Sequence, residues 1–228
     1  MEVRDRLALA LDVDDLVLAL RLARQLNPYF SVAKVGLELF SAAGPDAVTS
    51  LTDLGYKVFL DLKIHDIPTT VRRSARVIGA LGTTYLTLHA RAGPVMLRAG
   101  VDGLREGADA AGLPAAMVLA VTVLTSDADA PPHILGTRVA AAVEAGCGGL
   151  ICAAADVREA KQLAPRMLAV VPGIRMPASN SHDQVRAATP TDAFDAGADL
   201  LVVGRAVTQA DDPPAAAAAL VGSLNARG

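Results

Sequence analysis

Two lysines and two aspartates are spaced so that their charged groups could form a single site. Asp61, Lys63 and Asp66 follow one another closely, and Lys34 interrupts the apolar run 32–36. Side chains two apart in a strand point to the same face, so we expect Asp61 and Lys63 to share one face. Lys34 would reach the same space from the neighbouring strand, and Asp66 would lie just past the strand end. The charges would then alternate in sign in the order Lys34, Asp61, Lys63, Asp66.

This alternation of charge indicates the kind of chemistry that the site could perform. Nearby carboxylates favour the protonated form of an amine, so we expect Lys63 to be a cation. A cationic lysine suits the electrostatic stabilisation of a carbanion followed by proton donation. It does not suit Schiff-base catalysis, which needs a neutral amine, and an aldolase-type barrel is therefore disfavoured.

Polar residues also stand at the ends of other apolar runs, where buried strands rarely carry them. These residues are Asp12, Lys34, the segment 61–66, His89, Thr122, Thr125, Arg175 and Arg205. A structural ion pair explains any single buried Lys or Asp equally well. An uncompensated buried charge, however, costs on the order of several kcal/mol, so the convergence of so many at one end of a fold indicates a functional site.

The elements that must position these residues alternate between short β-branched runs and longer amphipathic runs. The short runs predict strands over residues 7–13, 31–37, 57–64, 85–89, 116–124, 149–153, 168–173 and 200–204. Helical patterns follow, for example over residues 14–26, 68–81, 94–110 and 134–145. First helical turns are marked by Pro45, Pro68 and Pro94, and helix ends by Gly55, Gly82, Gly112 and Gly146.

Eight strands that alternate with helices predict an α/β fold: a single (β/α)8 TIM barrel that spans residues 1–228 as one catalytic domain. The alternative is an open doubly wound sheet, which usually carries a glycine-rich GxGxxG turn after its first strand. That place holds Leu11-Asp12-Val13-Asp14-Asp15, which favours the barrel. Active sites of such barrels lie at the C-terminal ends of the strands, where the polar residues stand.

Composition disfavours several other classes of function. Hydrophobic residues make up 52% of the 228 residues and aromatic residues 3%, so we expect an aliphatic core and no base-stacking nucleic-acid platform. A net charge of −3 provides no field that attracts a polyanion. The charged N-terminus does not fit a signal peptide, and the longest apolar run, 113–124, is too short to span a membrane. Cys147 and Cys152 form no CxxC pair. We therefore predict a cytoplasmic protein without nucleic-acid or membrane partners.

A phosphate site is predicted near the end of the chain. Phosphate groups in barrels of this kind are commonly held by the loops after strands seven and eight. Arg175 follows the seventh predicted strand, and Gly204 and Arg205 follow the eighth. Backbone N–H groups at Gly204 and Arg205 would surround the anion, and the guanidinium would bind it through two hydrogen bonds. Many Gly-Arg pairs are only turns, so the position after the last strand carries this prediction.

With these residues in view, the chain resembles the bacterial type of orotidine 5′-phosphate decarboxylase over essentially its whole length. The segment Asp61-Leu62-Lys63-Ile64-His65-Asp66-Ile67-Pro68-Thr69-Thr70 reproduces the DxKxxDIPxT signature of that family. Shorter elements occur in the family's order, namely Leu9-Ala10-Leu11-Asp12, Lys34-Val35-Gly36, Val121-Thr122-Val123-Leu124-Thr125-Ser126, Pro172-Gly173-Ile174-Arg175, Asp183-Gln184, Thr189-Pro190 and Val203-Gly204-Arg205.

The resemblance implies a reaction and the residues that perform it. The reaction is decarboxylation of orotidine 5′-phosphate to uridine monophosphate, the last step of de novo pyrimidine synthesis, without a cofactor or a metal. Lys63 would be the proton donor, Asp61 would lie against the substrate carboxylate, and Lys34 would tie Asp61 to the ribose. Asp66 and Thr70 would reach the active site of a partner subunit in a homodimer.

The resemblance also implies a set of substrate-binding residues. Asp12 would bind a ribose hydroxyl, and Thr125 or Ser126 would bond the amide edge of the pyrimidine. Ile67 belongs to the same set through its place in the signature. The phosphate would be held by Arg175, Gln184, Gly204 and Arg205.

Two other functions remain open for such a sequence. The first is a sugar-phosphate decarboxylase or hexulose-phosphate synthase of the same superfamily, which needs Mg²⁺ and has Glu where Lys34 stands. Lys34 argues against it, because a cation there would repel the metal. The second is a non-catalytic sensor of phosphorylated ligands, which would not need Asp61 and Lys63 side by side.

Overall fold

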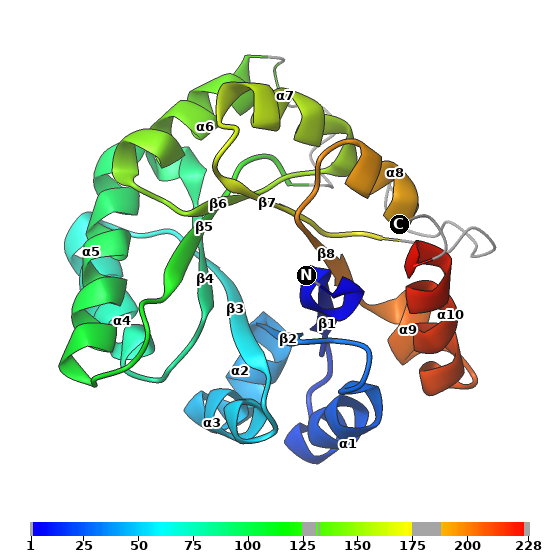
Figure 1. Cartoon of the computed structure of the whole chain (residues 1–228). Coiled ribbons are helices and arrows are strands. Elements are labelled where there is room, and N and C mark those ends of the chain that lie inside the picture. The colour runs from blue at the N-terminus through cyan, green and yellow to red at the C-terminus, as the bar shows by residue number, and fades with distance from the viewer. Residues whose placement is uncertain (1, 125–130, 132, 175–187, 226–228) are drawn as a thin grey trace.

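The computed structural model describes residues 2–124, 131, 133–174 and 188–225. Within these ranges eight parallel strands pair in chain order, and β1 also pairs with β8, so the sheet closes into a barrel (Figure 1). The strands are β1 (Leu7–Ala10), β2 (Val32–Gly36), β3 (Lys57–Ile64), β4 (Tyr85–His89), β5 (Met117–Val121), β6 (Gly149–Ile151), β7 (Leu168–Val171) and β8 (Leu200–Val203). The predicted (β/α)8 barrel is confirmed.

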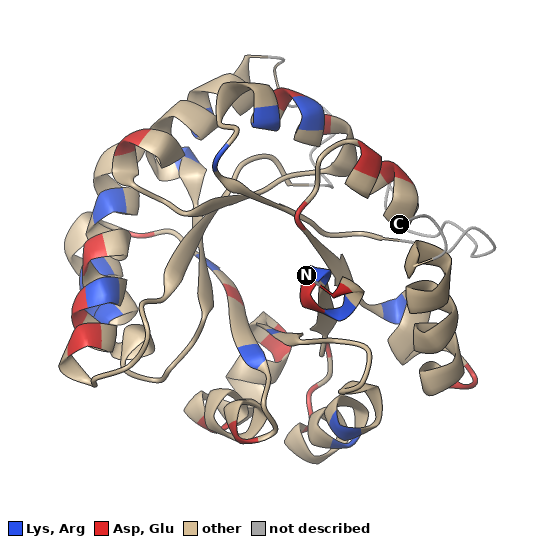
Figure 2. Ribbon diagram, in the orientation of Figure 1, with Lys and Arg blue, Asp and Glu red and all other residues tan. Residues whose placement is uncertain are grey.

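Helices surround the barrel and carry most of its charged side chains, while β3 carries both signs of charge itself (Figure 2). The α-helices are α1 (Leu16–Leu26), α2 (Leu37–Ala43), α3 (Pro45–Asp53), α4 (Pro68–Gly79), α5 (Pro94–Ala110), α6 (Ile134–Ala145), α7 (Val157–Leu163), α8 (Pro190–Asp195), α9 (Arg205–Thr208) and α10 (Pro213–Asn225). Short 3₁₀ helices are η1 (Val3–Arg6), η2 (Ala90–Ala92) and η3 (Ala154–Asp156). None of these helices is both long and apolar enough to cross a bilayer.

Several strands end earlier than the sequence predicts. β1 stops at Ala10 and β5 at Val121, although the predicted strands extend three residues further, to Val13 and Leu124. Leu11 and Val123, which follow the strand ends, are still buried, with 0% and 5% of their surface exposed. The residues just after these strand ends are apolar because they are still buried, although they no longer pair with a neighbouring strand.

Strand side chains alternate between the inside of the barrel and the helix layer, as the two-residue period requires. The outward residues join the large core between strands and helices. The inward residues form a separate apolar layer that consists of Ala8, Ala10, Val32, Phe59, Leu119, Val121, Ile151, Val170, Leu200 and Val202, with Tyr85, Met117 and Leu168 packed against it. This layer fills the barrel beneath its C-terminal rim and supports whatever lies above it.

Outside the barrel, glycines let α4 and α5 approach each other closely. Gly103 and Gly107 are four residues apart on α5 and therefore lie on one face of that helix. A Cβ atom on Gly103 would overlap the carbonyl oxygen of Arg72, and one on Gly107 would overlap that of Arg76. Both carbonyls belong to α4, so the main chains of the two helices are in direct contact.

This contact predicts opposite effects for two glycine-to-alanine changes. Gly107→Ala should lower the free energy of unfolding by about 1–3 kcal/mol, because the new methyl group overlaps the main chain of α4. Gly136 in α6 is the matched control, since a Cβ there meets only Leu163 Cδ1 at 3.9 Å. Gly136→Ala should raise the free energy of unfolding by about 0.5–1 kcal/mol. Urea unfolding measures both changes, and a Gly107→Ala variant as stable as the wild type would contradict the close contact.

Candidate active site

On each of the first four strands, the inward side chain above the apolar layer is polar. Each lies two positions after an inward apolar or aromatic residue, at or just beyond its strand. The four residues are Asp12, Lys34, Asp61 and Thr87. Because neighbouring strands bring these positions side by side, a local period of two in the sequence creates one polar layer at the C-terminal rim.

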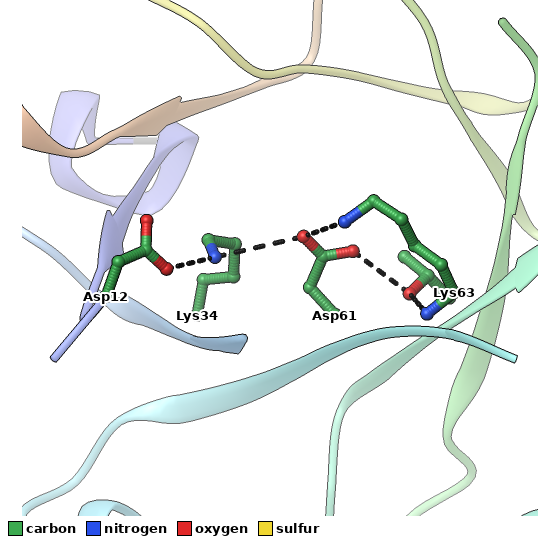
Figure 3. Close-up of polar contacts among 5 residues, drawn as sticks. Asp12, Lys34, Asp61 and Lys63 are labelled. Carbon is green, nitrogen blue, oxygen red and sulfur yellow. Dashed lines mark hydrogen bonds and ion pairs between the residues drawn. The ribbon is translucent and has the colours of Figure 1, made fainter. Parts of the chain in front are cut away.

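Three ion pairs join the charged members of this layer into a chain (Figure 3). Lys34 Nζ lies 2.8 Å from Asp12 Oδ1 and 3.8 Å from Asp61 Oδ2. Lys63 Nζ lies 2.8 Å from the same Asp61 oxygen. The predicted meeting of Lys34, Asp61 and Lys63 is therefore confirmed, and Asp12, which was expected only to bind a ribose hydroxyl, forms the other end of the chain.

Burial decreases along this chain of charges. Lys34 is only 7% exposed, and the side chain of Asp61 is 14% exposed. The side chains of Lys63 and Asp12 are 35% and 55% exposed. A buried ammonium group loses several kcal/mol of hydration, and the two flanking carboxylates compensate for this loss at Lys34. The two ends of the chain are left accessible to a ligand.

Gly36 leaves room for this arrangement. It follows Lys34 on β2 on the inward side, and a Cβ atom there would lie 3.1 Å from both Lys34 Nζ and Asp12 Oδ1. Such a distance is tighter than most real contacts, and a larger side chain would displace the ion pair. The absence of a side chain at Gly36 therefore allows the ion pair between Lys34 and Asp12 to form.

Lys63 reaches Asp61 through an irregular backbone. Its φ angle is +48°, and no other non-glycine residue in the described part of the chain has a positive φ. The pairing of β3 with β4 shifts between Leu60 and Ile64, so the strand bulges where Lys63 lies. The expectation of a regular strand is therefore wrong at Lys63, although the predicted meeting of the Asp61 and Lys63 side chains is confirmed. The left-handed conformation costs roughly 1–2 kcal/mol for such a residue.

Thr87 on β4 binds both residues and was not among the residues predicted for the site. The backbone N–H of Lys63 donates to Thr87 Oγ1 at 2.8 Å, and this hydroxyl donates to Asp61 Oδ1 at 3.0 Å. Thr87 is fully buried. The signal available in the sequence was a single threonine between two leucines in the strand Tyr85-Leu86-Thr87-Leu88-His89, next to the strand that carries Asp61.

Asp66 does not extend the chain of charges as predicted. Its carboxylate accepts a hydrogen bond from the N–H of Ile67 at 2.6 Å, and within the described residues no ion pair joins it to Lys63. β3 ends at Ile64 and the chain turns outward to begin α4, so this segment leaves the barrel rim. Asp66, Ile67 and Thr70 are all exposed, and 65% of the surface of Ile67 is accessible.

The predicted phosphate-binding residues are described only in part. Gly204 follows β8 and precedes α9, which begins at Arg205. A Cβ atom on Gly204 would lie 3.4 Å from Ala10 Cβ and 4.0 Å from Asp12 Oδ2, so this turn borders the polar layer. Four of the predicted substrate-binding residues lie outside the described ranges, and they are Thr125, Ser126, Arg175 and Gln184.

A barrel with paired ammonium and carboxylate groups at its C-terminal rim defines a class of α/β-barrel enzymes with a charged active site. The chain belongs to the Orotidine 5′-phosphate decarboxylase / HUMPS family, whose sequence profile matches residues 5–220. This finding confirms the resemblance and the enzyme class predicted from the sequence.

Individual relatives match over nearly the whole chain. The orotidine 5′-phosphate decarboxylase of Anaeromyxobacter dehalogenans is 45% identical over 235 residues, covering 98% of this chain and 100% of the relative. That of Moorella thermoacetica is 40% identical over 236 residues, covering 98% and 94%. The crystal structure of orotidine 5′-phosphate decarboxylase from Lactobacillus acidophilus superposes with a TM-score of 0.82 at 37% identity and covers 97% of this chain and 100% of that one.

His89, at the end of β4, has a lowered pKa. Burial is the main cause, and the positive charge of Arg138 is the second. The ring of His65 lies close by, with 5.8 Å between the ring centroids. The His89 Nδ1 atom accepts a hydrogen bond from the N–H of Arg91 at 3.4 Å, which the neutral ring can do and a fully protonated ring cannot.

The lowered pKa of His89 predicts how stability depends on pH. Between that lowered pKa and about 6.5, the unfolded chain binds more protons at this residue than the folded chain does. The contribution of His89 to stability is therefore present above about pH 6.5 and is lost as the pH falls through the lowered pKa. Ring-proton NMR should show His89 titrating below the ordinary value, and His89→Gln should remove this part of the pH dependence of unfolding. Titration at or above 6.5 would contradict the prediction.

Proposed function

We propose that the protein decarboxylates orotidine 5′-phosphate to uridine monophosphate without a metal or an organic cofactor. The observation that carries the proposal is the Lys63 ammonium group held 2.8 Å from the Asp61 carboxylate at the barrel rim, in a chain of this family. Relatives at 45% and 40% identity bear the name of this decarboxylase. The place in pyrimidine synthesis and a cytoplasmic location belong to the same proposal, as does the treatment of residues 1–228 as one catalytic domain.

The proposed reaction breaks one carbon–carbon bond and leaves its electron pair on the pyrimidine ring. The bond between the ring carbon and the carboxylate breaks, carbon dioxide leaves, and the electron pair remains on the ring carbon. The ammonium of Lys63 stabilises this developing negative charge, because a group already in place does not have to reorganise during the reaction. Lys63 then transfers a proton to the same carbon and becomes a neutral amine, which water reprotonates.

Asp61 and its neighbours orient the reacting groups. Asp61 would face the substrate carboxylate and repel it in the ground state, and this repulsion disappears as carbon dioxide leaves. Lys34 compensates the Asp61 charge and would also contact the ribose. Asp12, which is 55% exposed and paired with Lys34, has room to accept a hydrogen bond from a ribose hydroxyl.

The remaining substrate contacts complete the proposed site. Gly204 borders the polar layer beside Asp12, and α9 begins at the next residue, Arg205. Both residues would hold the phosphate group, together with Arg175 and Gln184. Thr125 or Ser126 would bond the amide edge of the pyrimidine. Phosphate binding far from the reacting carbon can lower the chemical barrier when its binding energy is realised in the transition state.

We further infer that two copies of the chain form a homodimer. Asp66, Ile67 and Thr70 lie exposed beside the rim, where they would complete the active site of the partner subunit. Ile67 supports this inference, because an apolar side chain with 65% exposure next to two polar ones suits an interface. The partner would then supply the negative charge that Lys63 does not receive from Asp66 of its own chain.

The alternative branch of the family, which depends on Mg²⁺ and sugar phosphates, fits the site less well. The place of a metal would border the ammonium of Lys34, which already occupies the space between Asp12 and Asp61. Among the described residues, no group of three or more His, Cys, Asp or Glu is placed to hold a metal ion. Independence from metal stays a prediction. A non-catalytic sensor is also disfavoured, because burial of paired charges lowers stability without serving such a role.

The central test is the fall in absorbance of orotidine 5′-phosphate when it is mixed with protein in excess EDTA. The wild type should turn over, and Lys63→Ala should lose at least about a thousandfold in kcat, since it removes both the stabilising charge and the proton donor. Lys57→Ala is the matched control, because Lys57 is exposed at the opposite end of the same strand.

Each result separates the functions. Turnover of orotidine 5′-phosphate that disappears in EDTA and returns with Mg²⁺ would contradict the independence from metal. No turnover of this nucleotide would refute the decarboxylase, and Mg²⁺-dependent turnover of a sugar phosphate would then separate the sugar-phosphate branch from the non-catalytic sensor. A Lys63→Ala variant with a near-normal rate would remove Lys63 from the mechanism but leave the reaction itself established.

The phosphate contact is tested by comparing two substrates. Arg205→Ala should lower kcat/KM for orotidine 5′-phosphate by roughly 10²-fold, which corresponds to about 3 kcal/mol for a charge-assisted contact. The nucleoside without phosphate should be a poor substrate for the wild type, and the variant should barely change that residual activity. Arg166→Ala, an exposed arginine outside the site, is the control. Equal fractional losses on both substrates would show that Arg205 is structural.

A further inference from the structure

The bulge in β3 places three residues opposite one residue of β4. Leu60 pairs with Leu86 and Ile64 pairs with Leu88, so the same interval holds residues 61–63 on β3 and Thr87 alone on β4. A bulge of this kind interrupts the regular ladder of backbone hydrogen bonds. The backbone N–H of Lys63 lies in the interruption and needs another acceptor.

The Thr87 hydroxyl fills this interruption and connects both members of the reacting pair. It accepts the N–H of Lys63 at 2.8 Å, and its own proton is directed to Asp61 Oδ1 at 3.0 Å. A hydroxyl has one proton to donate and can also accept, so both bonds form at once. The direction is fixed, because the amide can only donate and the carboxylate can only accept.

The two oxygens of Asp61 are thereby held from opposite sides. Oδ1 accepts from Thr87, while Oδ2 faces Lys63 at 2.8 Å and Lys34 at 3.8 Å. The carboxylate cannot rotate without breaking a bond at one oxygen or the other. Its plane therefore determines where the Lys63 ammonium rests, and Thr87 also holds the backbone from which the Lys63 side chain begins.

We infer that Thr87 is a positioning residue for the decarboxylation, acting through Asp61 and Lys63. Thr87 is fully buried beneath them, so it does not bind the substrate itself. The inference rests on the proposed function, and it assigns the hydroxyl, rather than the shape of the side chain, the task of orienting the two charged groups. A displacement of about 1 Å at a reacting group can cost 10²-fold in rate.

Other buried threonines of the barrel differ in one respect. Thr83 is 2% exposed, and its hydroxyl bonds only main-chain oxygens, those of Val58 and Tyr85. Thr122 is fully buried and donates to the carbonyl of Ile151. Neither contact involves a charged side chain. Thr83 is therefore a matched control for the loss of a buried hydroxyl near β4.

The test compares Thr87→Val, Thr87→Ser and Thr83→Val with the wild type by steady-state kinetics and thermal unfolding. Thr87→Val keeps the shape and removes the hydroxyl, so kcat should fall by about 10²-fold while KM changes by less than about threefold. Thr87→Ser keeps the hydroxyl and should stay within about threefold of the wild-type kcat. Thr83→Val should keep the wild-type kcat even where its melting temperature falls as far as that of Thr87→Val.

The outcomes are distinct from those of the proposed function. A wild type that does not decarboxylate the nucleotide would refute the function itself. A wild type that turns over, with Thr87→Val at a near-normal kcat, would overturn only the role of Thr87. Equal losses in Thr87→Val and Thr87→Ser would also overturn it, because the hydroxyl would then not be the determinant. If Thr87→Val does not fold, Thr87→Ala compared with Thr87→Ser gives the same decision.

Discussion

An ammonium group inside a barrel of aliphatic side chains is stable only while carboxylates stay beside it. Lys34 imposes this condition on Asp12 and Asp61, and Asp61 in turn holds Lys63. The apolar layer below closes the other side, so the charges cannot relax into the interior. The positions of four charged groups therefore follow from the compensation of one buried cation, and the same electrostatic order leaves Lys63 at one of the two accessible ends. Both the structure of the site and its chemistry therefore depend on the compensation of the Lys34 charge by Asp12 and Asp61.

Much of this arrangement could be predicted from residue patterns alone. The boundaries of β3, β4, α5 and α6 agree with prediction, because in these segments the apolar period and the bounding prolines and glycines coincide. The meeting of Lys34 with Asp61 followed from strand order and a period of two. Strand ends were predicted too late where an apolar run continued past the last pair, as at Val123. An apolar run indicates which residues are buried, and buried residues continue beyond the last residue that pairs with a neighbouring strand.

The remaining features depend on relations between segments that no single segment encodes. The Thr87 hydroxyl is important because of the register between β3 and β4, and by composition alone Thr87 resembles Thr83. The position of Asp66 depends on the direction that the chain takes after β3. The residue type of Lys63 gave no sign of its backbone, because a left-handed conformation is usually indicated by glycine and not by lysine.

The positive φ of Lys63 sets stability against activity at one position. Glycine would adopt the same backbone angle without steric cost, and the fold by itself would therefore accept glycine there more readily than lysine. Retention of a long cationic side chain at this bend is a trade-off in which a little folding free energy is given up for reactivity. Screens that select variants for thermal resistance alone would thus tend to remove the residue that the chemistry needs. For this reason, attempts to stabilise the barrel should leave the bulge of β3 unchanged and draw their gains from the outer helices.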